Sequence, residues 1–281
     1  MPSLFRWNIF VGLIIKEQCV IVQHDCSDWL ITQPEGNPTI EYANDLKVYA
    51  VFKRQFLSGK QSHNRKQRFL GDNCPLIYAL KGKNGLYTNI SSIKKLNYSF
   101  EIICTKIMKL ESQGYQLIIS IPSAHNISYI IAKRLAKKFN ALHLTNTLRK
   151  ITVNNAFQLL DSANVNVKEA KSLEFKIKIQ EKEVGNNGNF SLKGIPTKYR
   201  DIFPPFILNE HLSLSYKRIR ILLVDDLMAT GTTLITAREI IAQQYPNAVI
   251  HAICLFSSMK RQNQRLDNIK IKRYKDDTEC A

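Results

Sequence analysis

No two of the six cysteines have the Cys-x2-Cys spacing with which paired thiolates commonly hold a zinc ion. They are scattered over positions 19, 26, 74, 104, 254 and 280. Scattered cysteines in a chain of 281 residues are typical of reduced, mostly buried side chains rather than of a disulfide framework. The sequence therefore predicts a cytoplasmic protein without a paired-cysteine zinc site.

The N-terminus lacks the run of ~20 apolar residues that would cross a bilayer. Its apolar segment, Asn8–Ile15, is short and is interrupted by Lys16–Gln18. No small-residue cleavage site lies nearby, so we expect neither export nor a membrane segment. β-Branched residues resume at Cys19–Val22, which predicts two strands around a polar turn.

Acidic residues are in short supply. The chain has 23 Asp and Glu against 40 Lys and Arg, a net charge of +17 and a pI near 9.6. This charge favours anionic partners, either phosphate-rich small molecules or nucleic acid bound through a basic surface. A coding bias that makes the whole surface basic accounts for the composition equally well.

One basic stretch, from Lys53 to Arg68, is interleaved with Phe56 and Phe69. Such a stretch could hold phosphates and stack bases. We favour the alternative of a solvated surface element with two core-facing phenylalanines.

Strands and helices alternate from about residue 71. Leu117–Ile121 is an unbroken apolar run, as expected of a strand covered on both faces. Apolar residues recur every four positions over Ile127–Phe139, which indicates an amphipathic helix, and Ala141–Thr145 fits another strand. Tyr98–Leu110 also has helical spacing. The order predicts an α/β fold, an open parallel sheet with flanking helices.

The composition divides the chain into regions: a strand-rich basic annex (1–70), the α/β domain (71–258) and a basic polar tail (259–281). Within the domain, residues 161–216 interrupt the alternation and are expected to form a flap or hood. Gly185–Asn189 predicts a turn there, and the three prolines at 196, 204 and 205 argue against long regular elements. This segment is a candidate lid, from which four side chains could reach over a site: Lys168, Lys171, Tyr199 and Arg200. A disordered or packing insertion is the alternative.

The most specific pattern follows the strand-like run Arg220–Val224, where Asp225 and Asp226 lead into a threonine-rich turn and a helix. Open α/β sheets bind ligands at the carboxyl ends of their central strands. A Gly/Thr turn at a helix N-terminus offers N–H groups, hydroxyls and a positive dipole end to a phosphate. Gly231 lets the backbone approach closely. The two carboxylates can accept hydrogen bonds from vicinal ribose hydroxyls; an ordinary strand–turn–helix with acidic caps is the alternative.

The fourteen residues Ile221–Leu234 resemble the phosphoribosyl-pyrophosphate motif of the type I phosphoribosyltransferases over its full length. The resemblance implies that Asp225 and Asp226 are catalytic and bind the ribose 2- and 3-hydroxyls. It implies that the 5-phosphate is bound by Ala229, Thr230, Gly231, Thr232 and Thr233. It also implies Mg²⁺ as cofactor, held indirectly at the two aspartates through ribose hydroxyls or water. The implied ligand is phosphoribosyl pyrophosphate or a nucleotide.

Weaker similarity to the ComF-like, competence-associated branch extends over residues 75–256. It rests on Pro75–Gly82, Ile119–Ser123 and Leu148–Thr152. That branch has an arginine-rich loop after the proline and a cysteine zinc finger. Here the loop that begins at Pro122 contains no Arg or Lys, and the zinc cysteines are absent. Ser123 and His125 are the candidate pyrophosphate-binding residues of this loop, with a structural role for the histidine as the alternative.

Two functions are consistent with these features. The first is a magnesium-dependent phosphoribosyltransferase whose acceptor base is not identified by any motif. The second is a catalytically degenerate nucleotide-binding effector or accessory protein in a nucleic-acid assembly, of the DNA-uptake or retron-defence kind. A homo-oligomer or a nucleoprotein complex is compatible with either.

Overall fold

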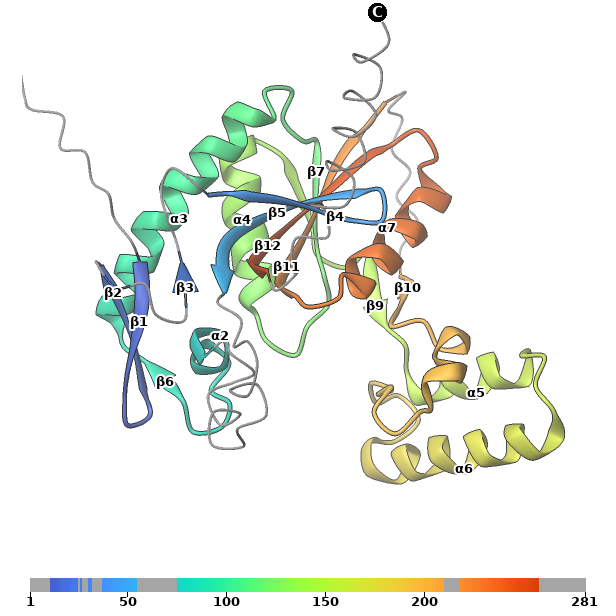
Figure 1. Ribbon diagram of the computed structural model, residues 1–281. Helices are drawn as coiled ribbons and strands as arrows, with labels where there is room; N and C mark the ends of the chain where they lie inside the picture. The colour runs from blue at the N-terminus through green and yellow to red at the C-terminus, as the bar shows by residue number, and fades with distance from the viewer. Residues whose placement is uncertain are drawn as a thin grey trace, which may run out of the picture.

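The computed structural model describes residues 11–24, 26, 30–31, 37–54, 75–209 and 218–257 of the chain. A seven-stranded sheet in the order β3-β5-β12-β11-β7-β8, with β4 also paired to β5, forms the main part (Figure 1). Five strands are parallel: β5 (Leu46–Arg54), β12 (Val249–Ser257), β11 (Arg220–Met228), β7 (Leu117–Ser120) and β8 (Leu142–Leu144). The antiparallel strands are β3 (Leu30–Ile31) and β4 (Thr39–Ala43). The predicted fold class, an open parallel sheet with flanking helices, is confirmed, with two antiparallel strands added beside β5.

Helices cover both faces of this sheet because its central strands are apolar on both faces. In β11, Leu222 and Val224 pack in one core with α3 (Ile90–Leu110) and α4 (Ile127–Phe139). Two neighbouring residues of the strand, Ile221 and Leu223, pack in a second core with α7 (Thr232–Gln244). The predictions of strands at 117–121 and 141–145 and of a helix at 127–139 are confirmed. The helix predicted at 98–110 begins earlier, where Asn89 caps it by accepting a hydrogen bond from the Ser92 N–H.

The hairpin of β1 (Val11–Lys16) and β2 (Cys19–His24) packs beside α3 and pairs with β6 (Tyr87–Thr88). This confirms the two strands predicted around a polar turn. The boundary expected at residue 70 does not hold, however, because β4 and β5 belong to the large sheet. Apart from the first residues of the basic stretch in β5, that stretch and the tail from residue 259 lie outside the described residues.

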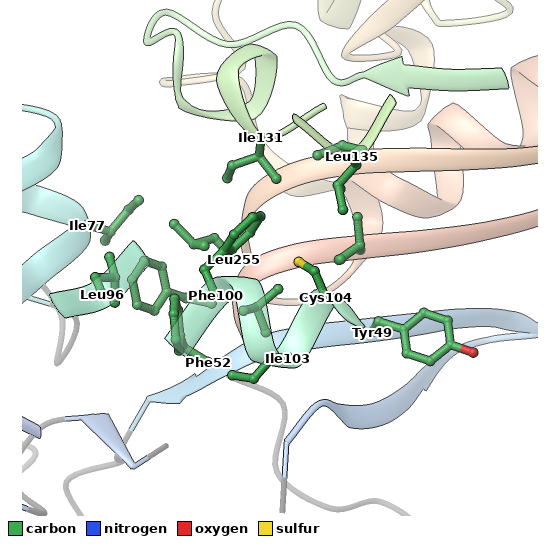
Figure 2. Packing of buried hydrophobic residues seen from close by; sticks show 14 of the residues in the cluster. Tyr49, Phe52, Ile77, Leu96, Phe100, Ile103, Cys104, Ile131, Leu135 and Leu255 are labelled. Atoms are coloured by element: carbon green, nitrogen blue, oxygen red, sulfur yellow. The ribbon is translucent and has the colours of Figure 1, made fainter. Parts of the chain in front are cut away.

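The short helix α2 (Pro75–Leu80) is held in the first core by buried Leu76 and Ile77. Figure 2 shows Ile77 beside Leu96 and Phe100 of α3, with Phe52 of β5 close to both. The helix ends in a turn in which the Lys81 N–H lies 3.0 Å from the Ile77 carbonyl oxygen. Core packing therefore fixes the place where the residues after α2 leave the helix.

A second unit projects from the sheet on the ribbon of β9 (Leu148–Lys150) and β10 (Phe206–Leu208) (Figure 1). It comprises α5 (Val153–Asp161), α6 (Val167–Val184) and the 3₁₀ helix η2 (Thr197–Ile202). Its apolar residues, from Ile151 to Phe203, form a core of their own. The expectation that residues 161–216 contain no long regular element is wrong, because α6 runs over 18 residues. The turn predicted at 185–189 is present directly after it.

At the amino-terminal edge of the sheet, Glu111 joins three strands to the end of α3. Its carboxylate pairs with Lys47 of β5 at 2.9 Å, with Arg220 of β11, and with Nδ1 of His251 in β12 at 3.4 Å. Burial alone would raise the pKa of Glu111, but hydrogen bonds from Tyr49 and Lys47 hold it below its ordinary value. The network lies away from the carboxyl ends of the strands and stabilises the opposite edge.

Among the described residues, no helix combines the length and apolar character needed to cross a membrane. Cys104 and Cys254 are buried free thiols, and Cys19 and Cys26 are partly buried and also free. The cysteines at 74 and 280 lie outside the described residues.

Candidate functional site

The two motif carboxylates lie inside β11, which continues four residues past the apolar run and ends at Met228. Both side chains are buried: Asp225 is 8% exposed and Asp226 is 4% exposed. They stand near the carboxyl end of the central strand, between β12 and β7. This is the position at which open α/β sheets bind ligands.

Asp225 is held by two donors. Its Oδ1 accepts the backbone N–H of Asp226 at 2.8 Å, and Ser128 Oγ at the start of α4 lies 3.4 Å from the same oxygen. Burial, and then the neighbouring carboxylate of Asp226, raise the pKa of Asp225 to about 7. A buried carboxylate with so high a pKa is typical of a functional site, where stability is given up for chemistry.

This pKa predicts that Asp225→Asn stabilises the protein above neutral pH. The folded protein keeps a proton on Asp225 up to about pH 7, whereas the unfolded chain releases it near 3.8. The free energy of unfolding therefore falls as the pH rises between these values, and asparagine removes that loss. We expect a gain on the order of 1–3 kcal/mol at pH 8, or a rise in melting temperature of about 3–10 °C.

Thermal unfolding of both proteins between pH 3 and pH 8 measures the effect. Asp161→Asn, at an exposed position at the end of α5, is the matched control and should leave the pH profile unchanged. A constant difference between Asp225→Asn and the natural protein at every pH would contradict the assignment.

Asp226 has a different partner, Lys81, which follows α2. The Lys81 Nζ lies 2.7 Å from Oδ2 of Asp226, and the two side chains are 14% and 6% exposed. Sequence reasoning missed this lysine, because 145 residues separate it from the aspartate along the chain. The one indication in the sequence was that Lys81 lies in Pro75–Gly82, a segment that is similar to the ComF-like branch but to which no role was assigned.

The predicted phosphate loop connects β11 to α7. Gly231 caps the helix with φ +81°, and its carbonyl accepts the Ile235 N–H at 2.9 Å. Ala229, Thr230 and Thr232 are exposed and Thr233 is partly buried. The hydroxyls of the first two threonines lie 3.0 Å apart. The loop thus presents hydroxyls beside the first turn of a 13-residue helix.

The loop after β7 lies next to the two aspartates. Ser120 of β7 pairs with Val224 of β11, and the Ile121 N–H donates to the Val224 carbonyl at 2.9 Å. In the loop, the His125 N–H donates to Ser123 Oγ at 3.3 Å. Slight burial and the nearby Lys83 and Lys81 lower the pKa of His125, while Asp226 opposes them.

His125 is therefore within electrostatic reach of Asp226 and of the two lysines that follow α2, Lys81 and Lys83. Two of the four side chains expected to reach over the site from the hood, Tyr199 and Arg200, make contacts within the hood instead. Tyr199 donates to Glu169, and Arg200 Nε donates to the Ile195 carbonyl at 3.2 Å, both within the hood itself. The site is therefore built from β11, the loop after β7, the start of α7 and the turn after α2.

A family model of the phosphoribosyl transferase domain matches residues 128–279, more than half of the chain. The chain belongs to this family. No curated protein and no solved structure matches it. In this phosphoribosyltransferase domain the matched range begins at α4 and includes the aspartates and the loop into α7. Lys81, Ser123 and His125 lie before it.

Proposed function

We propose that the chain binds phosphoribosyl pyrophosphate and transfers its phosphoribosyl group to a nitrogenous base. The observation that supports this most strongly is the succession of two buried carboxylates and an exposed Thr/Gly turn at the start of α7. Asp225 and Asp226 would accept hydrogen bonds from the ribose hydroxyls. Ala229, Thr230, Gly231, Thr232 and Thr233 would hold the 5-phosphate. Ser123 and His125 would face the pyrophosphate.

The residues fit a magnesium ion of the kind that phosphate ligands carry with them. Among the described residues, no group of three or more His, Cys, Asp or Glu side chains could form a cage for a metal. Mg²⁺ rarely needs such a cage, since it keeps several waters and binds through one or two carboxylates plus substrate phosphates. Asp225 and Asp226 would hold it through ribose hydroxyls or water. The ion would neutralise charge on the leaving pyrophosphate.

Transfer breaks the bond between the ribose carbon and pyrophosphate and forms a bond from that carbon to the base nitrogen. Positive charge develops on the ribose ring during the transfer. The chain would contribute by holding ribose and pyrophosphate in line and by placing carboxylates near the developing charge.

The hood on β9 and β10 is a proposed cover for the acceptor base. The similarity to the ComF-like branch also stays a proposal, because the arginine-rich loop and the zinc cysteines of that branch have no counterpart in this sequence.

The second candidate is an effector that binds the same ligand without turnover, in a nucleic-acid assembly. Two features favour it, the net charge of +17 and the absence of Lys and Arg from the loop Pro122–Asn126. The lysines near His125 weaken the second point, because they bring positive charge to that loop from elsewhere in the chain.

Two measurements test the proposal. By calorimetry, phosphoribosyl pyrophosphate should bind in the presence of Mg²⁺, and a chelator should weaken it about tenfold or more, since the pyrophosphate charge is then poorly neutralised. Release of pyrophosphate should occur with at least one member of a panel of purine and pyrimidine bases. Binding without release for any base would favour the effector, equal affinity with the chelator would contradict the magnesium assignment, and no binding would contradict the function.

A further inference from the structure

The loop that would face the pyrophosphate carries little charge of its own. Pro122–Asn126 contains no Lys or Arg, and slight burial with the nearby lysines lowers the pKa of His125, which disfavours its charged form. Two buried carboxylates lie beside this loop. Asp225 keeps its proton up to about pH 7, but the carboxylate of Asp226 would repel a polyanion entering here, so a cation from another part of the chain is needed.

Lys81 occupies the place that such a cation requires. We propose that Lys81 binds the pyrophosphate of phosphoribosyl pyrophosphate while staying paired with Asp226, and so joins the ribose-binding carboxylates to the leaving group. The inference rests on the proposed function and assigns the pyrophosphate contact to a residue outside the loop after β7.

The geometry allows one ammonium group to serve both partners. The Lys81 Nζ forms an ion pair with Asp226 Oδ2 at 2.7 Å, and a lysine ammonium has three N–H donors. The side chain keeps 14% of its surface exposed, so it is not sealed in the core. An ammonium group next to a ligand carboxylate can donate to phosphate oxygens in strong, charge-assisted hydrogen bonds.

The position of Lys81 is set by the core rather than by the ion pair alone. α2 is anchored by buried Leu76 and Ile77, and Figure 2 shows Ile77 packed against α3. After Lys81 the chain turns at Gly82, with φ +59°, and the Lys83 N–H donates to the Tyr78 carbonyl at 2.9 Å. A second lysine, Lys83, thus follows directly in this turn and also influences the pKa of His125.

The electrostatic environment of His125 indicates where both lysines lie. After slight burial, Lys83 and then Lys81 are the strongest influences that lower the pKa of His125, and Lys150 at the base of the hood adds to them. Lys81 therefore pairs with Asp226 and is also within electrostatic reach of His125 in the loop after β7.

Lys81→Gln tests the inference, because glutamine leaves a polar side chain beside Asp226 while removing the charge. Calorimetry is run with three probes in the presence of Mg²⁺: phosphoribosyl pyrophosphate, inorganic pyrophosphate and ribose 5-phosphate. We expect the first two to bind about 10–100-fold more weakly to the variant, since a charge-assisted contact is lost. Ribose 5-phosphate, which has no pyrophosphate, should bind within about threefold of its affinity for the natural protein.

Lys81→Arg, which keeps the charge, should recover part of the loss. Lys83→Met should weaken pyrophosphate less than Lys81→Gln does, because this lysine is exposed and makes no ion pair with Asp226. Lys109→Met is the matched control, since it removes an exposed lysine of α3 near the opposite edge of the sheet. It should change none of the three affinities. Thermal unfolding shows whether each variant is folded. If Lys81→Gln does not fold, Lys83→Met still tests whether the lysines that follow α2 contribute to pyrophosphate binding.

Unchanged binding of pyrophosphate to Lys81→Gln would overturn the inference. Equal losses for ribose 5-phosphate and phosphoribosyl pyrophosphate would also overturn it, because they would show that Lys81 acts only by holding Asp226. A natural protein that binds ribose 5-phosphate but no pyrophosphate would overturn this inference alone. A natural protein that binds none of the three probes would overturn the proposed function as well.

Discussion

Replacing both motif aspartates, Asp225→Asn with Asp226→Asn, should abolish binding of phosphoribosyl pyrophosphate while the protein stays folded. Above pH 7, where Asp225 is also ionised, each change removes a charged acceptor for a ribose hydroxyl, which costs about 1.5–3 kcal/mol. Together the losses amount to roughly 10²–10⁴-fold in affinity. The fold should survive because the amide that replaces the carboxyl of Asp225 carries no charge to bury, and Lys81 can turn its partly exposed ammonium toward water.

Calorimetry measures the affinity and thermal unfolding the stability. Asp161→Asn with Asp201→Asn is the matched control, since it removes two exposed carboxylates from the hood and should leave the affinity unchanged. Asp225→Asn alone keeps the pair of Lys81 and Asp226 and should give an intermediate loss. Unchanged affinity in the double variant would contradict the assignment of both aspartates as ribose ligands.

The parts of the fold that were predictable are those whose signal is local. Leu117–Ile121 is apolar without a break because β7 is covered on both faces, and Ile131 and Leu135 repeat because one side of α4 is buried. The motif of β11 and α7 is also local, since strand, carboxylates, turn and helix follow one another directly.

The membership of β5 in the main sheet was not predictable in this way. β5 pairs in parallel with β12, the last described strand, and the two lie at opposite ends of the chain. Periodicity within β5 shows that it is a strand but does not identify its neighbour. The ion pair of Lys81 with Asp226 is missed for the same reason, because it forms only when α2 and β11 pack around a common core.

The helix α6 was missed because its apolar signal is weak and its neighbourhood is rich in prolines. Only Leu173 and Ile177 of α6 are buried, whereas Phe175 and Ile179 are exposed, so the apolar residues do not mark a single face. The prolines at 196, 204 and 205 all lie after the helix has ended. They therefore shape η2 and the entry to β10 without breaking α6.

Replacing Gly231 with alanine should damage both stability and ligand binding. Gly231 has φ +81°, where an L side chain costs about 1–2 kcal/mol. An added Cβ would also lie 2.8 Å from the Cβ of Ala43, closer than two such atoms can approach. We expect Gly231→Ala to destabilise the protein by about 2–4 kcal/mol and to weaken phosphoribosyl pyrophosphate about tenfold or more, because the loop must move away from the phosphate.

Two further variants separate the causes of this loss. Gly194→Ala has a similar φ, +88°, but nothing lies within 4 Å of its added Cβ, so it reports the conformational cost alone and should leave the affinity unchanged. Ala43→Gly placed in the Gly231→Ala background removes the close contact but not the strained φ. It should therefore recover part of the stability and part of the affinity. If Gly231→Ala and Gly194→Ala lose the same stability, and Ala43→Gly recovers nothing, the packing of β4 against the phosphate loop is not what holds that loop in place.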